Sequence, residues 1–60
     1  MKVTVFNSKG KIQKTIEQST FTLAMSDLDK VKGKSNWYAR LDYADGDCDT
    51  FHYVHGEWCN

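Results

Sequence analysis

Apolar and polar residues alternate at the start of the chain in the way that predicts a β-strand. Over residues 2–6 the alternation places Val3 and Val5 on one side. Residues 7–10, Asn-Ser-Lys-Gly, follow with Asn at the first and Gly at the fourth position, which favours a type I turn closed by a glycine bulge. We therefore predict a first β-hairpin over residues 2–17.

The turn also predicts a pairing for this hairpin. A glycine bulge after residue 10 would set Val5 opposite Ile12 and Met1 opposite Ile16, giving one continuous apolar strip. The opposite side of the hairpin would then face water with polar residues, namely Thr4, Lys11 and Gln13.

A stronger hairpin signal spans residues 36–54. Two runs rich in aromatic and β-branched residues flank Asp45-Gly46, and glycine accepts a positive φ without steric cost. Two registers compete, because a slip of one residue sends a strand's side chains to the other face. One register sets Trp37, Ala39 and Leu41 opposite Tyr53, Phe51 and Asp49, and the other sets Arg40 opposite Asp49 and Tyr38 opposite Phe51. We favour the first, because burying aromatic rings outweighs an exposed ion pair worth roughly 1 kcal/mol or less.

Residues 19–34 fit two patterns. Phe21, Leu23 and Met25 alternate as in a strand, whereas Phe21, Met25, Leu28 and Val31 recur at helical spacing. Ser26 is a typical helix N-cap, and the acidic residues that follow it suit the first turn of a helix. Gly33 is a typical left-handed C-cap, and Lys30 and Lys32 before it suit the last turn. We predict a helix over about residues 26–32, with a start near residue 19 as the alternative.

Together these elements predict one domain, residues 1–60, of the α+β class. A small antiparallel sheet of two hairpins, about residues 2–17 and 36–54, would carry one short helix between them. If residues 20–25 form a strand instead, the alternative is a small five-stranded β-barrel. We expect Trp58 to fold back over one edge of the core, because a terminal aromatic ring is seldom left in water.

Charge is balanced over the chain but not along it. Eight basic and eight acidic residues cancel, yet residues 1–40 sum to +5 (eight Lys/Arg against three Asp/Glu) and residues 41–60 to −5 (five Asp/Glu, no Lys or Arg). Such asymmetry indicates either an interaction surface or two halves that pair with each other, and we favour pairing. No apolar run reaches the roughly 18 residues of a membrane span, and residues 1–4 do not resemble a signal peptide, so we expect a cytoplasmic location with no membrane contact.

Two constellations resemble metal sites. Cys48, His52, His55 and Cys59 have the ligand types of a zinc site, but the sequence has no close Cys-x2–4-Cys pair, and strand alternation separates the first two from the last two. Asp42, Asp45, Asp47 and Asp49 surround the Asp-Gly turn, but the chain lacks the closing Glu of a calcium loop. We therefore expect free thiols, no metal and no cofactor, and an acidic hairpin tip that could dock on a basic surface.

The sequence also bears on function. It contains no Gly-rich phosphate loop, nucleophile elbow or pairing of a nucleophile with its base, so we expect no enzyme. Eight aromatic residues in sixty exceed what so small a core hides easily, and exposed Tyr and Trp favour protein interfaces.

We therefore predict a small non-enzymatic binding protein, an inhibitor or regulator that docks on a larger host protein or complex. A compact, proline-free, aromatic-rich chain of this kind is typical of phage or mobile-element proteins. The predicted contact residues are Tyr38, Arg40, Asp42, Tyr43, Asp45, Asp47, Asp49, Tyr53 and Trp58. The alternative is a nucleic-acid-binding module that uses Lys30, Lys32 and Lys34 beside the aromatic residues. We expect a monomer, or a weak homodimer formed through an open sheet edge.

Overall fold

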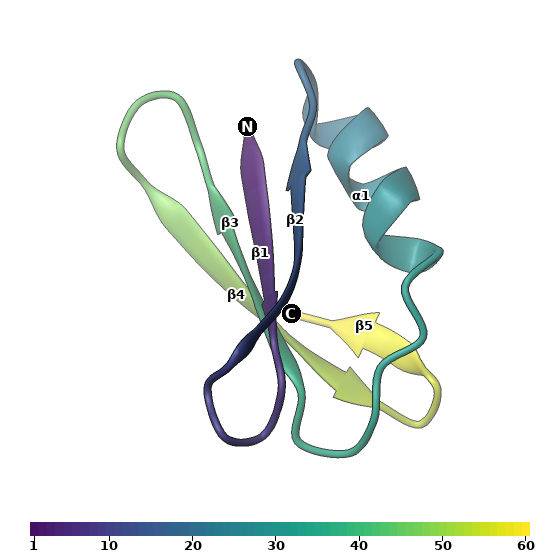
Figure 1. Ribbon diagram of the computed structural model, residues 1–60. Coiled ribbons are helices and arrows are strands. Elements are labelled where there is room, and N and C mark those ends of the chain that lie inside the picture. Colours follow the sequence, from purple (N-terminus) through teal and green to yellow (C-terminus); the bar gives the residue numbers. More distant parts are fainter.

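The computed structural model describes residues 1–60 and shows one helix and a five-stranded antiparallel sheet (Figure 1). The elements are β1 (Lys2–Phe6), β2 (Ile12–Glu17), α1 (Phe21–Asp29), β3 (Tyr38–Asp42), β4 (Cys48–Val54) and β5 (Glu57–Cys59). The strand order is β2-β1-β3-β4-β5, with every neighbouring pair antiparallel. The α+β prediction is confirmed. The barrel alternative is wrong, because the sheet stays open and residues 21–25 are helical.

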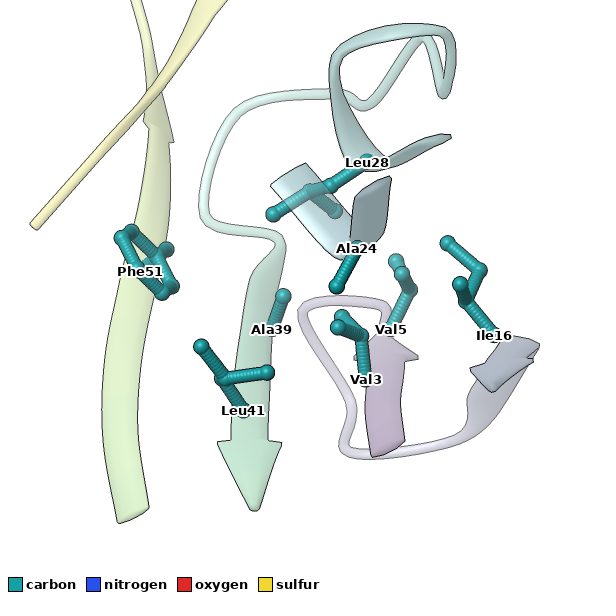
Figure 2. Close-up of a cluster of buried hydrophobic side chains, with 8 residues drawn as sticks. All are labelled: Val3, Val5, Ile16, Ala24, Leu28, Ala39, Leu41 and Phe51. Carbon is teal, nitrogen blue, oxygen red and sulfur yellow. The ribbon is translucent and has the colours of Figure 1, made fainter. Parts of the chain in front are cut away.

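The helix packs on one face of the sheet and encloses the core there. Figure 2 shows Ala24 and Leu28 of α1 among side chains from four strands. The buried apolar residues are Val3, Val5, Ile16, Ala24, Leu28, Ala39, Leu41 and Phe51. We call this side of the sheet the covered face and the opposite side the open face, because no element packs on the latter (Figure 1).

The second hairpin has the register favoured from the sequence. Ala39 lies opposite Phe51, and Leu41 lies opposite Asp49. This register gathers Ala39, Leu41 and Phe51 on the covered face, where all three are buried. Gly46 at the turn has φ +95°, which a residue with a side chain rarely adopts.

The first hairpin has the predicted turn but not the predicted register. Gly10 has φ +81°, and its N–H donates to the Asn7 carbonyl at 3.0 Å, as expected. Beyond the turn, however, Val3 lies opposite Ile16 and Val5 opposite Lys14, so the predicted pairs of Val5 with Ile12 and Met1 with Ile16 are wrong. The register shifts between Val5 and Phe6, because β2 contains one extra residue as a β-bulge.

The bulge changes which side of the sheet Ile12 occupies. Ile12 pairs with Phe6, whereas Lys14 pairs with Val5, and Phe6 and Val5 point to opposite faces of β1. Ile12 therefore belongs to the open face and is 58% exposed. Thr4 was expected in water, yet it is buried because β1 lies between two other strands.

The helix begins earlier than predicted. Thr20 is the N-cap, and its hydroxyl accepts from the Leu23 N–H at 3.2 Å, so Ser26 lies inside the helix and does not cap it. The helix ends at Asp29 with Lys30 as C-cap in a right-handed conformation, and Gly33 is not among the glycines with positive φ. The start is therefore close to the alternative at residue 19, and the predicted glycine cap is wrong.

The end of the chain adds a strand that the sequence did not indicate. In β5, Trp58 lies opposite Tyr53, and the two rings meet edge-on with centroids 4.9 Å apart. The Trp58 indole N–H donates to the Val31 carbonyl at 3.1 Å, which ties β5 to the segment after α1. Trp58 packs against the core, as predicted.

Candidate docking surface on the open face of the sheet

A row of side chains crosses one end of the open face. Cross-strand pairing places Ile12 opposite Phe6, Phe6 opposite Tyr38, and Tyr38 opposite His52. Directly paired residues of a sheet lie on the same face, so these four side chains form one line over β2, β1, β3 and β4. We call this line the aromatic row (Ile12, Phe6, Tyr38 and His52).

The two rings at the centre of this row stack on each other, and the Tyr38 hydroxyl reaches the β1–β2 turn near Gly10. The centroids of Phe6 and Tyr38 are 4.8 Å apart and their planes differ by 17°. That separation equals the usual spacing of neighbouring strands, about 4.8 Å. Rings lying flat on strands so close together would collide, so the two rings stack instead. Both are half-buried, and the row is therefore an apolar ridge ending in the exposed Ile12.

The rest of the open face is polar. The next cross-strand row contains Thr15, Thr4, Arg40 and Thr50, and the row beyond it contains Glu17, Lys2, Asp42 and Cys48. Arg40 and Asp42 form an ion pair at 3.3 Å between partly exposed side chains. Such a pair contributes about 1 kcal/mol at most. The apolar part of the open face is thus confined to the aromatic row and Val54, which is 41% exposed.

The structure divides the contact residues predicted from the sequence into three groups. Tyr38, Arg40 and Asp42 lie on the open face, since they alternate with the buried Ala39 and Leu41. Asp45 and Asp47 form the exposed tip of the β3–β4 turn, where the Asp45 carboxylate accepts from the Asp47 N–H at 3.0 Å. The covered face holds the remaining four, Tyr43, Asp49, Tyr53 and Trp58.

We expected some of Tyr38, Tyr43, Tyr53 and Trp58 to be exposed, and each of them keeps only part of its surface in contact with solvent. The large apolar side chains that are exposed are instead Ile12, Phe21, Leu23 and Val54. Of these, Ile12 lies in line with Phe6 and Tyr38, so the aromatic row is where exposed apolar surface and aromatic rings coincide.

Tyr43 is engaged within the protein. Its hydroxyl donates to the Asp49 carboxylate at 2.6 Å, and its ring stacks on Phe21 of α1 with centroids 6.4 Å apart. The hydrogen bond to Asp49 raises the pKa of Tyr43, and desolvation and the negative charges of Asp49, Asp45 and Asp47 raise it further. Tyr43 and Asp49 are therefore hydrogen-bonded to each other across the hairpin.

The charge asymmetry of the sequence becomes a separation between the two ends of the sheet. The turn with Lys9 and Lys11, the segment with Lys34, and the β4–β5 turn lie together at the lower end in Figure 1. The β3–β4 turn with Asp45 and Asp47 lies at the opposite end (Figure 1). Arg40–Asp42 is the one ion pair in the structure, and it joins the two halves only between neighbouring residues of β3.

The cysteines and histidines are only partly brought together. Cys59 lies opposite His52 on the open face, so the predicted separation of these two residues is wrong. Cys48 lies at the far end of β4, and His55 lies in the β4–β5 turn with φ +52°. No three His, Cys, Asp or Glu side chains form a group that could hold a metal ion, and both cysteines are free thiols.

The aromatic residues that follow the predicted nucleic-acid site pack within the protein, because Trp37 packs against the core and Tyr38 stacks on Phe6. Lys30, Lys32 and Lys34 are exposed beyond the end of α1, but the segment that carries them lies over two aromatic rings. A Cβ on Gly33 would come within 2.9 Å of Tyr53 and 3.3 Å of Trp58. Because the backbone covers these rings, they are not available to stack on bases beside the three lysines.

A shallow depression of about 670 Å³ opens at the acidic end. It is lined by Met1, Lys2, Glu17, Gln18, Ser19, Asp42, Tyr43 and Ala44. Neither a cysteine nor a histidine is among them, so the depression brings together no thiol or imidazole for nucleophilic or acid–base chemistry.

Comparison with protein-family models, with curated proteins and with solved structures found no match to this chain. The single helix, nine residues long, falls well short of what a membrane-spanning helix requires. Three members of the aromatic row, Phe6, Ile12 and His52, were not among the contact residues predicted from the sequence, and His52 was considered only as a zinc ligand. Phe6 could have been found from strand alternation, since it shares the face of Lys2 and Thr4. Nothing in the sequence indicated the bulge that brings Ile12 beside it.

Proposed function

We propose that this chain is a non-enzymatic binding protein that docks on a larger protein through the open face of its sheet. The observation that carries the proposal is the position of the aromatic row. The helix encloses one face of the sheet, whereas Ile12, Phe6 and Tyr38 form an apolar ridge on the other. Aromatic residues at the centre of a patch contribute most to protein–protein affinity.

The polar surroundings of the ridge support a protein interface. Arg40 and the threonines of the next row supply hydrogen-bonding groups beside the rings. An apolar centre with a polar rim is the usual arrangement of such interfaces. A chain with this surface and no assembled metal group acts by occupying a partner's surface, which is how an inhibitor or regulator works. Two free thiols agree with a reducing, cytoplasmic location.

The proposal is tested with two matched substitutions. Ile12→Asp places a charge in the aromatic row, whereas Leu23→Asp places the same charge on the outer side of α1. The two side chains are 58% and 48% exposed, so neither change should disturb the core. Tagged wild-type and variant proteins are used to capture partners from the cells that produce the protein naturally, after circular dichroism has shown that all three are folded.

We expect a protein partner to be captured by the wild type and by Leu23→Asp, and to be lost with Ile12→Asp. The reason is that a buried, unpaired carboxylate costs several kcal/mol at an apolar contact. Loss with Leu23→Asp and retention with Ile12→Asp would place the contact surface on the helix instead.

A further inference from the structure

The aromatic row lies at the basic end of the molecule. Phe6 and Tyr38 are paired, so the residues that follow Phe6 and those that precede Tyr38 lie at the same end of the sheet. These residues include Lys9, Lys11 and Lys34, all exposed. None of the three has a carboxylate oxygen within 4.0 Å of its ammonium, because the one ion pair of the structure is Arg40–Asp42. The open face carries one carboxylate at this end, Glu57, which lies opposite Val54 on β5. Lys9, Lys11 and Lys34 outnumber it, so the surroundings of the ridge carry a net positive charge.

A second copy of the chain is a poor occupant for this surface. Two copies stacked ridge against ridge with their strands pointing the same way would bring their basic ends together, and the like charges would repel. With the strands of one copy reversed the ridges would still meet, but Lys9, Lys11 and Lys34 of each copy would then lie over the polar rows of the other. There Arg40 and Lys2 balance Asp42 and Glu17, so no net attraction results.

Single-stranded nucleic acid also fits poorly. Bases stack on the faces of aromatic rings. Phe6 and Tyr38 stack on each other, so each ring turns one of its faces to the other ring and not to solvent. Carboxylates from Glu17 and Asp42 occupy the same face and would repel a phosphate backbone.

We propose that the ridge binds an acidic amphipathic helix of a partner protein, a conclusion that rests on the function proposed above. Apolar side chains along one stripe of the helix would pack on Ile12, Phe6 and Tyr38. Its acidic side chains would face Lys9, Lys11 and Lys34. The sheet would then have a helix on each face, since α1 already covers the other.

The size of the ridge fits this occupant. The aromatic row crosses four neighbouring strands, which span roughly 14 Å at about 4.8 Å per step. A helix rises about 1.5 Å per residue, so roughly ten residues, or about three turns, match the row. Anchors at positions i, i+3 or i+4, and i+7 would place one apolar side chain per turn along it.

The experiment uses three defined probes with the full chain. The first is a synthetic peptide of about eleven residues with leucine at i, i+4 and i+7 and mostly glutamate elsewhere. The second keeps the leucines and replaces glutamate by lysine. The third is single-stranded oligothymidylate. Backbone amide shifts measured by NMR report which residues each probe contacts.

We expect the acidic peptide to shift the amides of Phe6, Ile12 and Tyr38, and the lysine peptide not to do so. The double variant Lys9→Glu with Lys11→Glu should weaken binding of the acidic peptide roughly tenfold or more, because two attractions become repulsions. The matched control, Lys14→Glu with Lys30→Glu, makes the same charge change away from the open face and should leave binding unchanged.

Three results would overturn the inference. They are equal binding of the two peptides, absence of shifts along the aromatic row with the acidic peptide, and binding of oligothymidylate at the row. If any of them occurs while Ile12→Asp still abolishes capture of a protein partner, the docking function stands and only the chemistry assigned to the partner is wrong.

Discussion

The two faces of the sheet are built from alternate residues of the same strands, yet one face is covered by the helix and the other is open to solvent. In β3, Ala39 and Leu41 point to α1 and are fully buried, while Tyr38 and Arg40 between and beside them point to the open face. The covered face closes a core and leaves little for a partner. The open face keeps an apolar ridge that no element of this chain covers, and this ridge is the surface through which we propose binding.

The largest effect that this comparison predicts concerns two leucines of α1. Leu28 is fully buried against the covered face, so Leu28→Ala should lower the free energy of unfolding by roughly 2–5 kcal/mol. That is comparable to the total stability of about 3–5 kcal/mol expected for so small a core. Leu23→Ala, at a side chain 48% exposed, should change it by about 0.5 kcal/mol or less. Urea denaturation measures both, and equal losses would show that α1 does not pack as described.

A smaller loss is expected where the chain approaches the covered face most closely. A Cβ at Gly33 would lie 2.9 Å from Cγ of Tyr53, so Gly33→Ala must displace that ring and should cost roughly 1–3 kcal/mol. Ser35→Ala, in the same segment but exposed, serves as the control. Thermal unfolding of both variants tests this, and a Gly33→Ala protein more stable than wild type would mean that Tyr53 has room to move.

On the open face the predicted cost is smaller again. Tyr38→Ala removes the stacked pair with Phe6, which should lower the free energy of unfolding by about 1 kcal/mol. The double-mutant cycle with Phe6→Ala isolates the contribution of the stack. A loss as large as that of Leu28→Ala would mean that the ridge belongs to the core and would remove the contrast between the faces.

The smallest effect concerns Tyr43, whose raised pKa results chiefly from its hydrogen bond to Asp49. A raised pKa means that the folded protein holds the phenol proton to higher pH than the unfolded chain does. Stability from this source is complete below the unfolded pKa of about 10, and it is lost as the pH rises through the folded value. Denaturation at several alkaline pH values should therefore show a steeper loss for wild type than for Tyr43→Phe. Identical slopes would contradict the assignment.

The second hairpin shows how far sequence can predict structure. Its register was predictable because only one of two registers gathers Ala39, Leu41 and Phe51 on one face, and burial of those groups outweighs the exposed ion pair of the other. The first hairpin has no such contrast. Its turn was predicted correctly, but the bulge in β2 shifts every residue pair beyond it. A single extra residue leaves no recognisable mark in the pattern of apolar residues, so the shift could not be predicted.

The helix and the site show the same limit. Thr20 and Ser26 can both serve as N-caps, and the local sequence favoured Ser26. In the structure the helix begins after Thr20, which allows Ala24 to pack in the core. Likewise strand alternation places Tyr38 and Arg40 on the open face, whereas Tyr53 and Trp58 lie on the covered face. Their positions depend on β5, three residues whose pairing with β4 only the folded chain reveals.

The bulge in β2 has one more consequence. β2 is an edge strand of six residues, five of which are exposed. A straight exposed edge strand can pair with strands of other molecules and so promote aggregation. The extra residue bends that edge, and Lys14 places a charge along it. The same irregularity that turns Ile12 to the open face should thus help to keep the protein from polymerising into fibrils.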